Sequence, residues 1–226
     1  MENQGFNEEQ ARERISDEVR AELNNMGYRI LEADEVGSRD MVKVVNAYKD
    51  KLIDHDKEVD RIKQRYSDEV AASKLNVLEA DFRYDKESFA ENIDKIIAED
   101  RERRFAEAEK LQNTKDYKAD KKECFEILGL LKQAGAEIPD DMFISFINPL
   151  VQAKDTKSIA IAKLLAGTDT NQYICDRATD NINSYFNNQE LQNFGASAKQ
   201  FIATGESQLT LSLYMNKFEN QLRGGR

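Results

Sequence analysis

The sequence has no tryptophan and only two prolines, and its ten glycines are few for 226 residues. An all-β chain of this length needs many turns, and turns draw on glycine and proline for their backbone angles. These scarcities exclude an all-β fold. Charged residues make up 34% of the chain, above the usual share of about 25%, and they require a large solvated surface. We therefore predict an all-α fold, with a long coiled-coil-like helix followed by a compact C-terminal helical bundle.

Histidine occurs once, at His55. A single histidine excludes paired Glu-x-x-His di-metal sites, His-Glu-x-x-His zinc sites, and most histidine-containing triads unless His55 itself serves. The phosphate-binding patterns GxxxxGK[ST] and GxGxxG do not occur either. The acidic run from Asp54 to Asp60 resembles a calcium loop, but it lacks the turn glycine and lies in a helical stretch. We expect a non-enzymatic protein with no cofactor and no metal.

The two cysteines, Cys124 and Cys175, lie far apart and form no CxxC pair. This spacing indicates a reducing compartment and no disulfide framework. The first ten residues have neither the basic nor the apolar region of a signal peptide. The longest apolar stretches are too short to span a bilayer. We expect a cytoplasmic location, or one within an assembled particle, and no membrane partner.

Residues 38–112 contain neither glycine nor proline, and apolar residues recur among them at alternating gaps of four and three. Such a two-per-heptad stripe is typical of a helix that packs along another helix. A gap of four from Tyr66 to Val70 interrupts the alternation as a stutter. The predicted helix–helix interface consists of Met41, Val45, Tyr48, Leu52, His55, Val59, Ile62, Tyr66, Val70 and Val77.

The same segment carries further apolar positions after the stutter. The first stripe continues at Ser73, Val77, Ala80 and Tyr84, and a second stripe occupies Leu75, Leu78, Phe82, Phe89, Ile93 and Ile97. Two stripes suit contact with more than one neighbour. One unbroken helix would be on the order of 110 Å long, at 1.5 Å per residue. A reversal near Ala71–Ser73 would make a shorter hairpin, and the sequence leaves both arrangements open.

The flanking parts of the chain are also predicted to be helical. Residues 1–37 form an N-terminal amphipathic helix, from near Asn7, and a connector, and Ser38 is expected to cap the long helix. Residues 113–226 form a C-terminal helical domain. Its candidate helices are Lys118–Gln133, Pro139–Ala153, Thr156–Ala166, Thr170–Asn187, Gln189–Ala203 and Ser207–Leu222, and Pro149 should kink or end the second of them.

The net charge of −10 is concentrated in the first half of the chain. Residues 1–112 carry 20 Lys and Arg against 29 Asp and Glu, whereas residues 113–226 carry 13 against 14. An acidic rod repels phosphates, so we expect no direct nucleic-acid binding by it. Basic residues are mixed among the acids between Lys49 and Arg65, which is typical of a solvated helix surface.

These features favour a structural, assembly or adaptor protein that acts through helix–helix contacts with protein partners, as a homo-oligomer or as part of a larger assembly. Viral scaffolding and minor structural components share this plan, which is an analogy of architecture alone. The alternative is an acidic inhibitor that blocks a nucleic-acid-binding effector, and it requires acids concentrated on one face. His55 has two interpretations, a polar interface residue that sets register and a pH-sensitive contact.

Overall fold

The protein is all-α, as the scarcity of turn residues predicts. A computed structural model describes residues 36–206 and 208–224, and this part of the chain contains helices and no strand. The predicted amphipathic helix from Asn7 lies outside the described residues. The described chain divides into two units, one of residues 36–101 and 189–224 and the other of residues 102–188.

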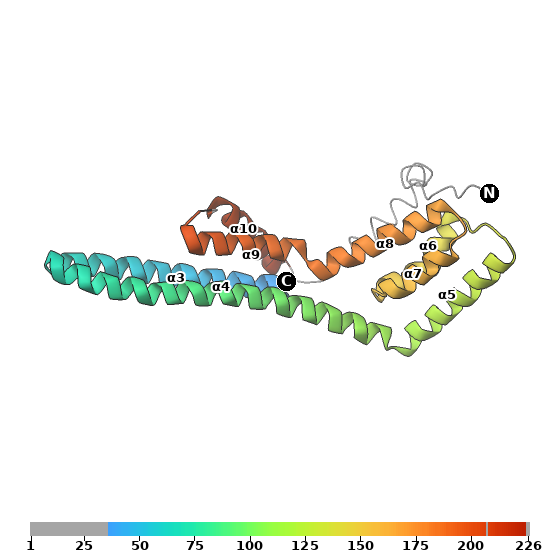
Figure 1. The fold of residues 1–226 in the computed structure, drawn as a ribbon, viewed down its shortest axis with the longest axis horizontal. Coiled ribbons are helices and arrows are strands. Elements are labelled where there is room, and N and C mark those ends of the chain that lie inside the picture. Colours follow the sequence, from blue (N-terminus) through green and yellow to red (C-terminus); the bar gives the residue numbers. More distant parts are fainter. Residues whose placement is uncertain (1–35, 207, 225–226) are drawn as a thin grey trace. The chain divides into compact units, whose positions relative to one another are not determined.

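The first unit is built on a helical hairpin, formed by α3 (Val36–Arg65) and the first part of α4 (Asp68–Gln112). The chain reverses at Tyr66 and Ser67, and Figure 1 shows the two helices lying along each other on either side of this reversal. Residues 38–112 are therefore two antiparallel helices and not one rod. The turn lies a few residues before Ala71–Ser73, where the sequence left a reversal open.

Helix-end chemistry explains why the chain turns here without glycine or proline. Lys63 and Arg65 lie in the last turn of α3, where the negative end of the helix dipole stabilises positive charges. Asp68 and Glu69 open α4 at its positive end. The carbonyl of Ser67 accepts the first hydrogen bond of α4, from the Ala71 amide at 2.8 Å. The gap of four after Tyr66 is thus a loop between helices.

Aromatic side chains fix the register of the hairpin. The Tyr48 and Phe89 ring centroids lie 5.3 Å apart, and those of His55 and Phe82 lie 4.1 Å apart in a stacked pair. Nearer the turn, the Lys74 ammonium lies 4.8 Å from the centre of the Tyr66 ring. These contacts pair later residues of α3 with earlier residues of α4, as an antiparallel arrangement requires.

Two C-terminal helices, α9 (Gln189–Thr204) and α10 (Gln208–Gly224), cover the open end of the hairpin. The Tyr48 hydroxyl donates to the Ile202 carbonyl at 3.3 Å. At Gly195 an added Cβ would lie only 2.7 Å from the Ile97 side chain, so α9 approaches α4 closely. Figure 1 shows the hairpin continuing past α9 and α10 to its turn. Its tip is therefore a pair of helices without that cover.

α3 begins at Val36 in the described chain, and Ser38 is buried inside its first turns instead of capping it. The reason is a tight crossing at the base of the hairpin. A Cβ on Gly37 would lie 2.7 Å from a carboxylate oxygen of Asp100 and 2.9 Å from the Leu191 side chain. Only a glycine lets α3 pass this close to both α4 and α9.

The second unit is a bundle around one apolar core. It contains residues 102–112 of α4 followed by α5 (Lys115–Gln133), α6 (Asp140–Gln152), α7 (Thr156–Leu165) and α8 (Asp169–Asn187). These helices begin and end within a few residues of their predicted bounds. Pro149 lies inside α6, which continues three residues beyond it to Gln152.

The two units cut across the domain boundaries expected from composition. A single C-terminal domain of residues 113–226 was predicted, but α9 and α10 join the hairpin while α5 to α8 join the end of α4. The physical reason is long-range packing, because α9 and α10 bury Leu191, Phe194 and Phe201 in the same cluster as Met41 and Phe82. Composition changes near residue 113, but contacts decide which helices fold together.

The hairpin offers a matched pair of aromatic substitutions. Phe82 is 5% exposed and Tyr84, two residues later, is 73% exposed. We expect Phe82→Ala to lower the free energy of unfolding by about 3–5 kcal/mol through the cavity it leaves. Tyr84→Ala should change it by less than about 0.5 kcal/mol. Urea denaturation followed by circular dichroism, at low protein concentration, checks both; equal effects would contradict the packing described.

Candidate interaction surface

The structure divides the ten residues of the predicted interface into two groups. The first group lies on α3, buried or partly buried: Met41, Val45, Tyr48, Leu52, His55, Val59 and Ile62. The second group is exposed and begins at the turn: Tyr66, Val70 and Val77. The heptad stripe therefore lies in the seam of the hairpin up to Ile62 and lies on an exposed surface from Tyr66 onward.

The reversal of the chain explains this division. On α4 the side facing α3 carries the second apolar stripe, whose members Phe82 and Ile93 are buried and whose Leu75 and Leu78 are partly buried. Val70 and Val77 are 45% and 62% exposed. They do not extend the seam, because a residue in the first stripe of α4 lies on another side of the helix from Phe82. Periodicity identified both stripes but could not assign each to its neighbour.

An apolar row therefore remains uncovered on α4, near the hairpin tip. We call it the outer stripe, and it consists of Val70, Ser73, Val77, Ala80 and Tyr84. All five are exposed. Their gaps of three and four place them along one face of the helix, the spacing with which helices pack against each other. The small residues Ser73 and Ala80 alternate with the larger ones, so a second helix could approach this face closely.

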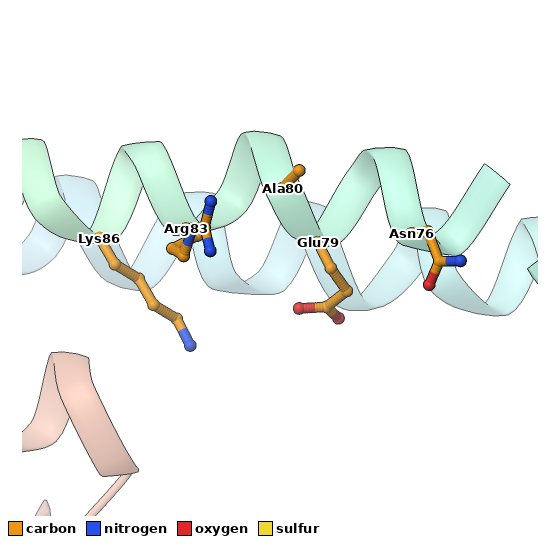
Figure 2. Close-up of a pocket in the computed structure, with 5 residues that line it drawn as sticks. All are labelled: Asn76, Glu79, Ala80, Arg83 and Lys86. Atoms are coloured by element: carbon orange, nitrogen blue, oxygen red, sulfur yellow. The ribbon is translucent and has the colours of Figure 1, made fainter. Parts of the chain in front are cut away.

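Shallow grooves border the outer stripe on both sides. One, of about 320 Å³, lies between α3 and α4 and is lined in part by Ile62, Tyr66, Ser73 and Val77. The other, of about 410 Å³, lies along α4 and includes Ala80 and Arg83. Figure 2 shows the second groove, with Asn76, Glu79 and Lys86 projecting from the same helix. The stripe is thus a ridge between two depressions, a shape that fits the grooves of another helix.

Charged residues flank the outer stripe with both signs on each edge. Glu69 and Arg83 occupy one edge, and Lys74 and Asp81 occupy the other, as the helical spacing requires. Within the described part of the chain, none of these four forms an ion pair.

Some of the other exposed charges on the hairpin have ion-pair partners within the chain. Examples are Asp40–Lys43, Lys51–Asp85, Asp54–Lys57 and Glu58–Arg61. Acids and bases therefore pair at several places on the hairpin surface.

His55 lies in the seam of the hairpin. Its ring stacks on Phe82, its Nε2 lies 3.3 Å from a carboxylate oxygen of Glu79, and its Nδ1 lies 3.5 Å from one of Asp56. These contacts join α3 to α4 at one position. They fit the interpretation of a polar residue that sets the hairpin register.

A cluster of polar side chains in the second unit has the residue types of a catalytic site, and it centres on Asp155. The Asp155 carboxylate accepts hydrogen bonds from the Tyr117 hydroxyl at 2.5 Å, the Ser158 hydroxyl at 2.6 Å and the Lys121 ammonium at 3.0 Å. It also accepts from the Ser158 amide and so caps α7. The carboxylate therefore joins α5 to the start of α7 through hydrogen bonds from both helices.

Electrostatics support a structural role for this cluster. Burial alone would raise the pKa of Asp155, but hydrogen bonds from Ser158, Tyr117 and Lys121 outweigh it and hold the pKa well below its ordinary value. Burial, together with the bond to the carboxylate, raises the pKa of Tyr117 above its ordinary value. Neither the Asp155 carboxyl, whose pKa is lowered, nor the Tyr117 phenol, whose pKa is raised, titrates near neutral pH, where a general acid or base is effective.

A second polar node holds the end of α4 to α8. The buried Arg104 donates to the Tyr185 carbonyl at 3.1 Å, and its guanidinium lies 4.6 Å from the centre of the Tyr185 ring. The Lys154 ammonium lies 4.7 Å from the same ring, and the Tyr185 hydroxyl donates to Glu107 at 3.2 Å. Cations against an aromatic face stabilise packing when they are desolvated. Burial correspondingly lowers the pKa of Lys154.

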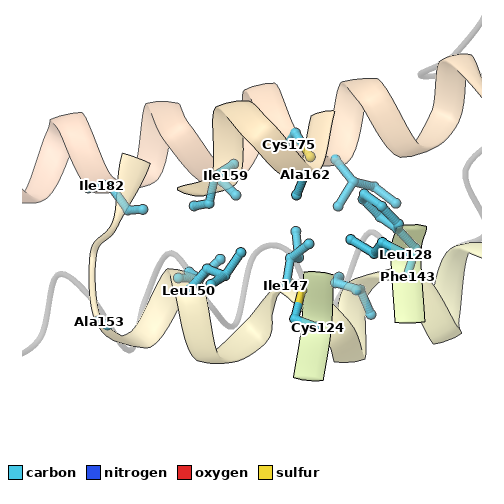
Figure 3. Packing of buried hydrophobic residues seen from close by; sticks show 14 of the residues in the cluster. Cys124, Leu128, Phe143, Ile147, Leu150, Ala153, Ile159, Ala162, Cys175 and Ile182 are labelled. Atoms are coloured by element: carbon cyan, nitrogen blue, oxygen red, sulfur yellow. The ribbon is translucent and has the colours of Figure 1, made fainter. Parts of the chain in front are cut away.

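The cysteines are buried in the core of the second unit, where Figure 3 shows Cys124 and Cys175 among the side chains of α5, α6, α7 and α8. Burial raises the pKa of the Cys124 thiol to about 11. Burial, with a smaller contribution from Asp176, raises that of Cys175 to about 12. Thiols are nucleophilic as thiolates, so both are unreactive packing residues.

Comparisons with known proteins offer no further guide, since no family model, characterised protein or solved structure matches the chain. Among the described residues, no group of three or more His, Cys, Asp or Glu side chains is placed to hold a metal ion. No helix in that part of the chain has both the length and the apolar character needed to cross a membrane.

The Asp155 cluster predicts a pH-dependent stability. Because the folded-state pKa is depressed, its contribution is present above the ordinary value of 3.8 and is lost as the pH falls below it. We expect Asp155→Asn to lower the free energy of unfolding by about 1.5–3 kcal/mol at pH 7. The difference from wild type should shrink progressively below pH 4. Asp120→Asn, at an exposed position of α5, is the control, and a deficit unchanged by acid would contradict this role.

Proposed function

We propose that the protein is a non-enzymatic assembly or adaptor protein, and that the outer stripe binds a helix of a protein partner. The observation that carries the proposal is the exposure of Val70, Val77 and Tyr84 in one row on a helix. Single exposed apolar residues are ordinary, but a row at heptad spacing along the tip of a hairpin matches the pattern that helices use to recognise each other.

The energetics favour a partner that is itself a preformed helix. A large apolar side chain contributes about 1.5–3 kcal/mol when it is fully buried. Three such side chains from this helix and a similar number from a partner offset the cost of association, estimated at roughly 4–15 kcal/mol. A disordered partner would add the cost of its own ordering. The hairpin adds no ordering cost of its own, because α3 already packs against the opposite side of α4.

The charge pattern weighs against an acidic decoy for nucleic-acid-binding effectors. A decoy requires acids concentrated on one face, without basic residues among them. On the hairpin, Lys51 lies beside Asp85 and Lys57 beside Asp54. The outer stripe has a basic residue on each edge, at Lys74 and Arg83. Such alternation favours selective contact with another protein.

A photo-crosslinking side chain at position 77 tests the proposal in the cells that produce the protein. We expect Val77 replaced by benzoyl-phenylalanine to give a discrete cross-linked species, because a partner helix covers this position. The same replacement at Lys95, whose side chain is 70% exposed and which lies about five turns further along α4, is the control. Absence of any specific product from position 77, with the protein folded and expressed, would contradict the proposed function.

A further inference from the structure

We propose that the partner of the outer stripe is a second copy of this chain, with the two α4 helices packed antiparallel about a two-fold axis at Val77. This inference rests on the proposed function and names the partner. The arrangement is isologous, since the same surface is used by both copies, and it closes at two chains.

The side chains of the outer stripe are arranged symmetrically about Val77. Seven residues before and after it lie Val70 and Tyr84, both large and apolar. Closer to it lie Ser73 and Ala80, both small. In an antiparallel pair Val77 meets Val77 of the second copy, Val70 meets Tyr84, and Ser73 meets Ala80. Each large side chain therefore meets a large one, and the small pair lets the helix backbones approach.

The charges on the edges of the outer stripe also favour an antiparallel pair. An antiparallel pair brings Lys74 beside Asp81 of the second copy, and Glu69 beside Arg83 of the second copy. Symmetry forms each pair twice. Within the described chain none of these four charges forms an ion pair, so each is available to a second copy. Opposite charges that meet across an interface fix its register and orientation.

A parallel pair uses the same residues less well. It brings Glu69 beside Lys74 of the second copy, which is one of the usual parallel pairings across a helix interface. It leaves Asp81 and Arg83 without opposite charges, and it places Tyr84 against Tyr84 and Val70 against Val70. The antiparallel arrangement alone pairs all four charges.

The fold of the first unit also leaves room for this pairing. α4 begins at Asp68, nine residues before Val77, so the antiparallel overlap extends nine residues after it, to Lys86. The cluster that α9 and α10 help to bury contains Met41 to Tyr48 on α3 and Phe82 and Ile93 on α4. Phe82 lies on the side of α4 that faces α3, away from the outer stripe. In the antiparallel pair, most of the covered part of the second copy lies beyond the turn at Tyr66 and Ser67 of the first copy, where α4 of the first copy has already ended. The contact therefore involves the uncovered tips.

Disulfide trapping in the purified full chain tests the geometry. Val77→Cys should form a disulfide-linked dimer under mild oxidation, because the residue lies on the axis. Tyr84→Cys should not, whereas a mixture of Val70→Cys and Tyr84→Cys chains should form the mixed dimer. Cys124 and Cys175 are buried and do not compete. A Tyr84→Cys homodimer formed as readily as the Val77→Cys dimer would indicate parallel packing and overturn the arrangement.

Charge exchange tests the pairing without a new thiol. Lys74→Asp should raise the dimer dissociation constant by roughly tenfold or more, since each 1.4 kcal/mol is a factor of ten. The double variant Lys74→Asp/Asp81→Lys should restore it, because exchange preserves both pairs. Asp54→Lys/Lys57→Asp, an exchange within an exposed pair of α3, is the control. Sedimentation velocity measures the constants, and circular dichroism confirms that each variant is folded.

The outcomes separate this inference from the proposed function. Trapping at Val77 together with restoration by the double exchange supports the two-fold pair. A chain that stays monomeric at every concentration, while position 77 cross-links to another protein in cells, overturns self-association and leaves the proposed function standing. A monomeric chain whose position 77 cross-links to nothing overturns both.

Discussion

The aromatic contacts at the covered end of the hairpin determine the rest of the first unit. Tyr48 contacts Phe82, Phe89 and Phe201, and its hydroxyl bonds to the backbone of α9. This one residue therefore aligns α3 with α4 and attaches α9 to both. With the register fixed, Phe82 faces inward and the outer stripe necessarily faces solvent. The surface available for binding is a consequence of the packing at the opposite end of the hairpin.

The two ends of the hairpin follow different physical rules. At the covered end, large apolar side chains from four helices exclude water, and the hydrophobic effect dominates. At the tip, two helices cannot bury all of their apolar positions, so Val77 and Tyr84 remain exposed. Mixed charges beside them keep the tip solvated when it is alone and restrict which helices it accepts. The polar clusters around Asp155 and Tyr185 meanwhile hold the helices of the second unit together.

Sequence periodicity predicted the fold class, most helix bounds and the buried face of α3 from Met41 to Ile62. It did not locate the turn, because Ser67 followed by Asp68 and Glu69 is a capping signal without a glycine or a proline. It assigned Val70 and Val77 to the seam, because a repeat of three and four residues does not reveal which neighbour a stripe contacts. The placement of α9 depends on contacts such as Tyr48 with Phe201, which local pattern does not encode.

We propose that the outer stripe on α4 is covered by the same stripe of a second copy of this chain. A nitroxide label attached at position 77 of the full chain measures this directly by electron paramagnetic resonance. Two packed helices have axes about 8–10 Å apart, so the account predicts strong dipolar broadening that disappears when labelled chains are diluted with unlabelled ones. A spectrum with no dipolar broadening at any protein concentration, from a folded chain, would contradict it.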